Sequence, residues 1–255
     1  MTQVAILAAG LGSRLGKPFP KPLTPLESGQ TILRRQIGHT RSAFGADTSI
    51  IVVVGFKLDL VIEAAPDVLF AYNELFDQTN TSKSLLRALR LSADGGVLWM
   101  NGDVVFNSQV LDQLLPVIKA DRSFVCVNTS SVTDEEVKYT VDGSGYVAQL
   151  SKDVGPDALG EAVGINYVSG SHKAALARQL DRCAAQDYFE RGIELAIESE
   201  GQWWEALDIS KFECVEVDFE ADLALANVLM GSQQFDSVEP ETALPTSGRR
   251  GAESR

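Results

Sequence analysis

The chain has 255 residues, of which 45% are hydrophobic and 22% charged, a balance typical of one ordinary globular domain. The net charge is −13 and lysine and arginine are not clustered, which excludes a nucleic-acid groove. Three widely spaced cysteines and two histidines favour neither a disulfide framework nor a histidine-rich metal site. The longest apolar run, residues 50–54, is far shorter than the roughly 20 residues that span a bilayer. With no signal peptide before the first strand, we expect a cytoplasmic protein that makes no membrane contact.

Strand-like and helix-like segments alternate along the first half of the chain. Apolar runs predict buried strands at residues 4–8, 50–54, 96–100 and 123–127. Helical periodicity predicts helices at residues 31–43 and 82–91, and another that opens at a capping Asn107. This alternation predicts an α/β, Rossmann-like layered fold with a mixed, mainly parallel central sheet.

The rhythm changes after Asn128. Residues 137–141 and 146–150 flank the turn sequence Asp142-Gly143-Ser144-Gly145, which predicts a β-hairpin insertion. Further elements are expected at residues 162–169 (strand), 173–184 and 188–199 (helices), 214–217 (strand) and 220–230 (helix). The last segment, residues 232–255, has almost no apolar residues and predicts a disordered tail.

A glycine loop follows the first strand. Such a loop exposes backbone N–H groups that suit a phosphate chain. It is not a P-loop, because Gly10 and Gly16 enclose five residues instead of four and Pro18 replaces the hydroxyl residue. It is not a dinucleotide fingerprint either, because the third glycine comes one place late.

What remains is the pattern A-A-G-x-G-S-R at residues 8–14, followed by Pro20-Lys21-Pro22-Leu23. Over residues 4–230 the chain resembles the nucleotidyltransferases that couple an NTP to a phosphorylated small molecule, whose signature is G-x-G-[ST]-R followed by P-K. The resemblance implies catalytic roles for Lys21 and Arg14, with Arg14 on the β- and γ-phosphates and Lys21 at the α-phosphate under attack. The alternative is a glycine turn that carries two solvated cations. The nucleotide-binding set implied in this part of the chain is Leu7, Ala8, Ala9, Gly10, Gly12, Ser13 and Arg14.

Two aspartates follow predicted strands. Asp103 ends a buried strand, where ligands sit in open α/β sheets, and it resembles the family's metal- and nucleotide-binding aspartate; the alternative is a turn residue. Asp218 lies in a segment similar to the family's E-[IV]-D-x-x-x-D-L element, and it would join the metal or cap the next helix. Glu216, two residues earlier on the same side of the strand, is the second-choice ligand. Mg²⁺ suits such carboxylates because phosphates and water complete its shell.

The base and acceptor sides rest on resemblance to the phosphocholine-type cytidylyltransferases. Asn80 and Ser84 would contact the base or ribose, or would cap a helix. Lys138 and Lys152 would attract the acceptor's phosphate or phosphonate, and Glu161 would line the acceptor's pocket. These residues fall in an acceptor-binding insertion expected at about residues 129–170, within a nucleotidyltransferase domain expected at residues 1–231. A choline cation would want aromatic rings, for which Tyr188, Phe189, Trp203 and Trp204 are available unless they belong to the core.

The resulting prediction is transfer of CMP from CTP to a phosphocholine, 2-aminoethylphosphonate or phosphonoformate type of acceptor, with Mg²⁺ and release of pyrophosphate. The expected partners are these small molecules and neither nucleic acid nor membrane, and a homodimer is left open. One alternative is a sugar-1-phosphate nucleotidyltransferase, disfavoured because Ser151-Lys152-Asp153 replaces that branch's E-K-P. The other is a catalytically silent regulatory subunit, which would be expected to lose Arg14, Lys21, Asp103 or Asp218.

Overall fold

The structure is a computed structural model that describes residues 2–130, 132 and 136–231. Its strands are β1 (Gln3–Ala8), β2 (Ser49–Val54), β3 (Leu69–Tyr72), β4 (Val97–Asn101), β5 (Val104–Phe106), β6 (Phe124–Asn128), β7 (Lys138–Val141), β8 (Val147–Ser151), β9 (Gly160–Val168), β10 (Glu205–Asp208) and β11 (Cys214–Glu216). Its helices are α1 (Ile32–Phe44), α2 (Leu58–Ala64), α3 (Thr81–Leu91), α4 (Gln109–Lys119), α5 (Gly170–Arg182), α6 (Phe189–Glu200) and α7 (Glu220–Gly231), and the short 3-10 turns are η1 (Ser13–Leu15) and η2 (Lys21–Leu23).

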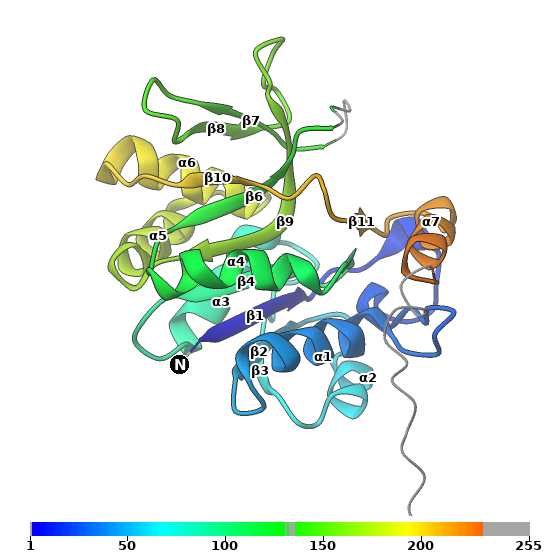
Figure 1. The fold of residues 1–255 in the computed structure, drawn as a ribbon. Coiled ribbons are helices and arrows are strands. Elements are labelled where there is room, and N and C mark those ends of the chain that lie inside the picture. The colour runs from blue at the N-terminus through cyan, green and yellow to red at the C-terminus, as the bar shows by residue number, and fades with distance from the viewer. Residues whose placement is uncertain (1, 131, 133–135, 232–255) are drawn as a thin grey trace, which may run out of the picture.

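A mixed sheet of nine strands forms the centre of the molecule (Figure 1). Its main path runs β10-β6-β9-β4-β1-β2-β3, and along this path β9 runs against the other strands. The hairpin of β7 and β8 joins the sheet through β9. The expected α/β fold, with a mainly parallel central sheet and a β-hairpin insertion, is therefore confirmed.

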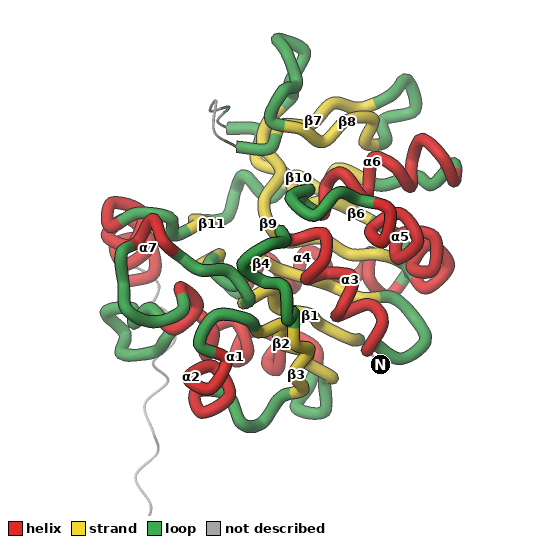
Figure 2. Tube along the Cα trace, turned by 180° about the vertical axis from the view of Figure 1, so that it is seen from behind, coloured by secondary structure: helices red, strands yellow, loops and turns green. Residues whose placement is uncertain are grey.

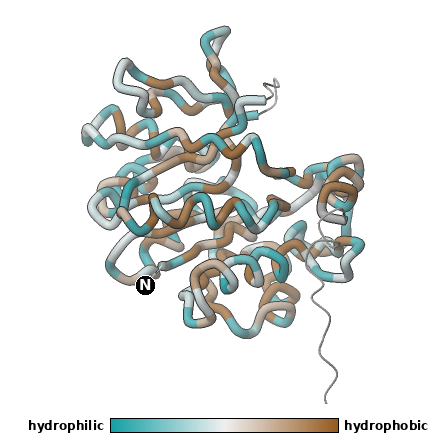
Figure 3. The backbone as a smooth tube through the Cα atoms, viewed as in Figure 1, coloured by the Kyte–Doolittle hydropathy of each residue, from teal (hydrophilic) through white to brown (hydrophobic). Residues whose placement is uncertain are grey.

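Helices cover both faces of the sheet, with α1, α2 and α4 on one face and α3, α5 and α6 on the other (Figures 1 and 2). Side chains alternate along β1, so Val4 and Ile6 pack under the first layer while Ala5 and Leu7 pack under the second. Figure 3 shows the hydrophobic colour concentrated along the central strands. Burial on both faces explains why the parallel strands are continuous apolar runs.

A smaller apolar cluster attaches the C-terminal helix to the glycine loop. Its members come from the loop, the start of α1, β5, the residue after β11, and α7; they are Leu15, Leu26, Ile32, Val105, Val217 and Ala226. In the same region β11 pairs with β5, the short strand that follows Asp103. Residues almost 200 positions apart in the sequence are thereby fixed beside one another.

Four elements were not expected from the sequence: α2, β3, β5 and β10. The strands among them have three or four residues each, too few for a clear periodicity, and β10 begins and ends with a charged residue. Helix α2 follows Lys57, which has a left-handed backbone and no capping side chain, so the usual start signal is missing. The N-cap of α4 is Ser108, one residue after the expected Asn107. Asn107 still accepts a hydrogen bond from the backbone N of Gln109, the first residue of the helix, at 3.0 Å.

The described residues include no helix that is both long and apolar enough to cross a membrane. The expected tail at 232–255 lies outside the described residues. The domain boundary at 231 and the extent of the acceptor-binding insertion stay predictions.

The tandem tryptophans are engaged in packing, which favours the interpretation of them as structural residues over the interpretation as rings around a cation. Trp204 is fully buried and meets Trp99 edge-to-face at 6.1 Å between ring centroids. Trp203 is on the surface, where its ring contacts Tyr146 and His172. Both side chains are used in packing, so neither is available to surround a bound cation.

Replacing Trp204 with alanine is expected to lower the free energy of unfolding by about 3–5 kcal/mol, because the change leaves a large cavity beside Trp99. Trp203→Ala is the matched control and should cost less than about 1 kcal/mol at its 39% exposed position. Urea denaturation of the two variants measures both values. Equal losses would show that burial does not distinguish the two rings.

Candidate active site

The candidate site forms where β1 and β4 end side by side. Leu7 lies opposite Asn101 in the parallel pairing, and the backbone N of Gly102 donates to the Leu7 carbonyl at 2.9 Å. A Cβ on Gly102 would stand 2.8 Å from that carbonyl oxygen and 2.8 Å from Cγ of Pro22. A glycine is required here because any side chain would push the glycine loop away from Asp103.

The glycine loop brings Lys21 back over the end of the sheet. Gly12 has φ +62°, a left-handed conformation that favours glycine, and a Cβ there would lie 3.2 Å from Cβ of Lys21. Lys21 opens η2 between Pro20 and the buried Pro22. Its side chain is only 12% exposed. The backbone of the loop thus holds a nearly buried ammonium group at a defined place.

Two cations from this loop meet two carboxylates. The Lys21 ammonium lies 2.8 Å from Asp103 Oδ2 and also donates to Asp218 Oδ1, while Arg14 Nη1 lies 2.9 Å from Asp218 Oδ2. Burial acts to lower the pKa of Lys21, but its ion pairs with Asp103 and Asp218 outweigh this and raise it. Burial acts to raise the pKa of Asp218, and Lys21 and Arg14 reverse this, so that carboxyl group has a lowered pKa. Lys21 and Asp218 therefore form a charged pair at neutral pH.

The interpretation of Asp218 as a helix cap is wrong for its side chain. The carboxylate that caps α7 belongs to Asp222, whose Oδ2 accepts from the backbone N of Asp218 at 3.0 Å and of Phe219 at 2.7 Å. Asp218 is left to face Lys21 and Arg14. Of the two aspartates in this element, Asp222 therefore caps α7, and Asp218 forms ion pairs in the candidate site.

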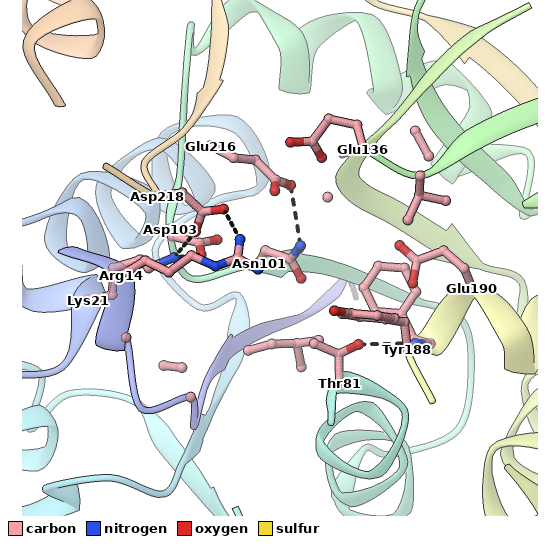
Figure 4. Close-up of a pocket in the computed structure, with 18 of the residues that line it drawn as sticks. Arg14, Lys21, Thr81, Asn101, Asp103, Glu136, Tyr188, Glu190, Glu216 and Asp218 are labelled. Atoms are coloured by element: carbon pink, nitrogen blue, oxygen red, sulfur yellow. Dashed lines mark hydrogen bonds and ion pairs between the residues drawn. The ribbon is translucent and has the colours of Figure 1, made fainter. Parts of the chain in front are cut away.

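A cavity of about 300 Å³ opens over this cluster. Figure 4 shows Arg14, Lys21, Asp103 and Asp218 grouped at one end and Tyr188 and Glu190 at the other. The sequence-predicted residues that line the cavity are Leu7, Ala8, Gly10, Gly12, Arg14, Lys21, Asp103, Lys152, Tyr188, Phe189, Glu216 and Asp218. The structure therefore brings the loop, the two aspartates and one acceptor lysine to a single place. The side chain of Ser13 lies outside the description.

A smaller hollow adjoins the cavity across the start of α3. The predicted residues that line it are Leu7, Ala9, Gly10, Asn80 and Ser84. Asn80 is the N-cap of α3 and accepts a hydrogen bond from the backbone N of Thr81 at 2.8 Å. The capping interpretation of Asn80 is confirmed, and its contact with a base or ribose stays a prediction. Ser84 is buried, with its Oγ 3.2 Å from Nδ2 of Asn73.

Lys138 and Glu161 do not line the cavity, which corrects the expectation that Lys138 and Lys152 face one anion. The two residues pair directly across β7 and β9, and both are buried. The Lys138 ammonium donates to the carbonyl of Lys152 at 3.0 Å. This hydrogen bond holds the backbone at Lys152 in place and directs the Lys138 ammonium away from the cavity. Lys152 itself lies with Nζ 5.4 Å from the centre of the Tyr188 ring.

Three glutamates line the cavity, and only Glu216 was a candidate from the sequence. Burial raises the pKa of Glu190 to about 7, against the opposing effect of its own backbone N–H and of Lys152. Burial, together with the charges of Asp103 and Glu136, raises the pKa of Glu216 to about 8. Burial and then Glu161 also raise the pKa of Glu136. Glu136 lies two residues before Lys138, in a segment that resembles the cytidylyltransferases, but it was given no role from the sequence, and Glu190 belongs to no motif. Only the fold places both in the cavity lining.

Asp103 and Asp218 are the residues that would hold a divalent metal. Both carboxylates already converge on one cation, the Lys21 ammonium, which shows that positive charge is stabilised between them. No group of three or more histidine, cysteine or acidic side chains is arranged to hold a metal in the described part of the chain. Two carboxylates fit Mg²⁺, which completes its shell with phosphate oxygens and water.

Comparison with known proteins identifies the family. The MobA-like NTP transferase domain matches residues 4–187. The chain is 29% identical to the CMP-5'-(3-aminopropyl)phosphonate synthase of Streptomyces rubellomurinus, over 86% of this chain and 37% of that protein. It is 31% identical to the bifunctional protein GlmU of Paraburkholderia phytofirmans, over 77% of this chain and 45% of that protein. The chain thus spans less than half the length of these two relatives.

Solved structures share the fold. The CTP:phosphocholine cytidylyltransferase LicC of Streptococcus pneumoniae superimposes with a TM-score of 0.69 at 17% identity, covering 90% of this chain and 99% of that one. The inositol-1-phosphate CTP transferase of T. maritima does so with a TM-score of 0.75 at 16% identity, covering 94% and 98%. The resemblance to the nucleotidyltransferases seen in the sequence is confirmed: the chain belongs to the MobA-like NTP transferase family.

Proposed function

We propose that this enzyme transfers CMP from CTP to a small phosphate or phosphonate acceptor and releases pyrophosphate. The observation that carries the proposal is the meeting of Lys21, Arg14, Asp103 and Asp218 at one end of the cavity. The relative named as a CMP-5'-(3-aminopropyl)phosphonate synthase supports a cytidine nucleotide and a phosphonate. Lys152, which lines the cavity, supports an anionic acceptor.

The reaction needs positioning and charge neutralisation more than a general base, because the acceptor's phosphonate or phosphate oxygen is already an anion. That oxygen attacks the α-phosphorus in line. The bond from the α-phosphorus to the bridging oxygen then breaks, and pyrophosphate leaves with the electron pair. Lys21 would neutralise the α-phosphate as its charge develops, and Arg14 with the loop N–H groups would hold the leaving phosphates.

We further propose that Asp103 and Asp218 bind Mg²⁺ for this reaction. When bound there, the ion would screen the negative charge of the triphosphate. The Lys21 ammonium, which now bridges both carboxylates, would then be free to face the α-phosphate. In the free protein Lys21 would thus neutralise the two aspartates, and in the complex the aspartates would bind Mg²⁺ while Lys21 contacts the nucleotide.

Pyrophosphate release from each of the four NTPs, offered with a panel of acceptors, tests the proposed function. We expect CTP to be preferred, with 2-aminoethylphosphonate, phosphocholine or phosphonoformate used at higher kcat/KM than glucose 1-phosphate. The physical reason is the absence of the sugar branch's acidic residue at Ser151-Lys152-Asp153. Glucose 1-phosphate as the best acceptor would replace the proposal with a sugar-1-phosphate nucleotidyltransferase, and no release with any NTP would contradict the proposed reaction.

A further inference from the structure

The end of the cavity away from Arg14 and Lys21 is acidic (Figure 4). Glu136 and Glu190 line it, and of the described lining residues Lys152 is the cation beside them. Two carboxylates against one ammonium leave an excess of negative charge when both are ionised. An excess of this sign is unexpected where the substrates are anions, unless one of them also carries a positive group.

One carboxylate oxygen of Glu190 lacks a hydrogen-bond donor. It is the second residue of α6 and only 9% exposed, so its position is fixed by the helix. Its Oε2 is fully buried and has no hydrogen-bond partner among the described residues. A buried carboxylate oxygen without a donor is costly. Since Glu190 lines the cavity, the structure has room for that donor to come from a bound molecule.

Lys152 does not supply this donor. Its ammonium lies over the Tyr188 ring, 5.4 Å from the centroid, and no hydrogen bond joins it to Glu190 in the described structure. Its backbone is held in place by Lys138. Lys152 therefore lies near the acidic end without satisfying it, and stays available to the acceptor's anionic group.

We propose that Glu190, with Glu136 beside it, binds a primary ammonium group at the far end of the acceptor, so that the acceptor is an amino-alkyl phosphonate or phosphate. This inference rests on the proposed function and narrows its acceptor. A primary ammonium donates three N–H groups, which carboxylate oxygens accept. A quaternary ammonium has none to donate and is recognised by aromatic faces. Of the aromatic residues that line the cavity, Tyr188 already contacts the Lys152 ammonium and Phe189 is buried against Trp99. Both tryptophans of the 203–204 pair lie outside the lining.

The titration of Glu190 gives the proposal a pH signature. Its pKa is raised to about 7 by burial, with Glu194 and Glu136 adding to the rise and Lys152 opposing it; Glu216 also lies within electrostatic range. Glu190 is thus largely protonated below pH 6 and ionised above pH 8. The preference for an acceptor with an amine, relative to the same acceptor without it, should therefore increase between these pH values. The ammonium group lowers the second pKa of the phosphonate, so the two acceptors ionise differently. The pH dependence of the ratio is therefore compared with that of the Glu190→Gln variant, in which this contribution of the acceptors is unchanged.

The experiment compares 3-aminopropylphosphonate with propylphosphonate as acceptors for CMP from CTP. The wild-type enzyme is expected to favour the amine in kcat/KM by roughly 10- to 100-fold, the usual value of a hydrogen bond between charged groups. Glu190→Gln should lower kcat/KM for 3-aminopropylphosphonate by that factor and leave propylphosphonate within about threefold. The N-trimethylated form of the amine should be a poor acceptor for the wild-type enzyme.

Glu198→Gln is the matched control, because Glu198 is on the same helix and its side chain is 56% exposed on the surface. This variant should leave kcat/KM unchanged for both acceptors. Glu190→Asp, which keeps the charge, should retain part of the preference for the amine if the variant with glutamine loses it. Thermal melting of each variant shows whether it is folded.

Two kinetic outcomes would overturn the inference. The first is an equal kcat/KM of the wild-type enzyme for both phosphonates. The second is a Glu190→Gln variant whose kcat/KM falls by the same factor for both phosphonates, as expected if Glu190 only positions Lys152. Calorimetric binding of the two phosphonates to the wild-type enzyme separates this inference from the proposed function. Tighter, Glu190-dependent binding of the amine without any transfer of CMP would support the ammonium site and contradict the proposed reaction; equal binding would contradict the site.

Discussion

Lys21→Ala is expected to lower kcat at least a hundredfold while the dissociation constant for CTP increases only a few-fold. The charge of Lys21 would matter most as the α-phosphate becomes five-coordinate, so its loss destabilises the transition state more than the bound nucleotide. A preorganised electrostatic contact of this kind contributes a factor on the order of a hundred to a thousand in kcat. Single-turnover kinetics and calorimetric binding of CTP measure the two quantities separately.

The same change should also affect the stability of the metal-free protein. Without Lys21, the carboxylates of Asp103 and Asp218 lose the cation that they share. The melting temperature should fall in EDTA and recover in millimolar Mg²⁺, because a bound cation would replace the missing charge. Lys17→Ala is the control, since Lys17 lies on the same loop but pairs with the exposed Glu220. A variant that weakens only CTP binding would make Lys21 a binding residue.

The second large effect is expected at the other side of the metal site: Asp103→Asn should lower turnover at least a hundredfold at saturating Mg²⁺. An amide oxygen carries no net charge, so the affinity for the cation and the screening of the triphosphate both fall. The fold should be retained, because the Asp103 side chain is 23% exposed and no part of an apolar cluster. Calorimetric titration with Mg²⁺ and thermal melting, beside the activity, separate loss of the metal from loss of structure.

Asp112→Asn serves as the control for this variant. Asp112 is an exposed residue in the first turn of α4, away from the cavity lining, and its replacement should leave turnover unchanged. Near-normal turnover in Asp103→Asn would remove Asp103 from the metal site. Loss of turnover with unchanged Mg²⁺ affinity would instead indicate that Asp103 acts by positioning Lys21.

The phosphate end of the site was predictable because its chemistry is local in the sequence. Gly12, Lys21 and Asp103 each lie within a few residues of a strand end, and backbone geometry restricts which residue types fit there. The parallel order of β1 and β4 then brings the two segments together, and an alternating α/β pattern is enough to predict that order. The glycine spacing also excluded the P-loop and the dinucleotide fold by counting alone.

The acceptor end was decided by tertiary structure. Glu190 and Tyr188 lie at the start of an ordinary amphipathic helix, and nothing in their spacing marks them as cavity residues. Lys138, on β7, and Lys152, directly after β8, were equivalent in the sequence, yet one ammonium donates to a backbone carbonyl and the other lines the cavity. Trp203 and Trp204 are neighbours in the chain, but one is fully buried and the other is on the surface.

The physical reason is that burial, and the pairing of charges within it, depends on which elements pack together rather than on the residues themselves. Periodicity and backbone conformation act over a few residues and can be read from the sequence, so it determined the strands, the glycine loop and the family. The direction of a side chain at a strand edge and the desolvation of a carboxylate depend on contacts between segments far apart in the chain. Glu136 and Glu190 lie in two such segments. The sequence by itself therefore determined the glycine loop and the residues that meet at its end of the cavity, and only the packing of α6 against the hairpin of β7 and β8 decided the charge at the other end.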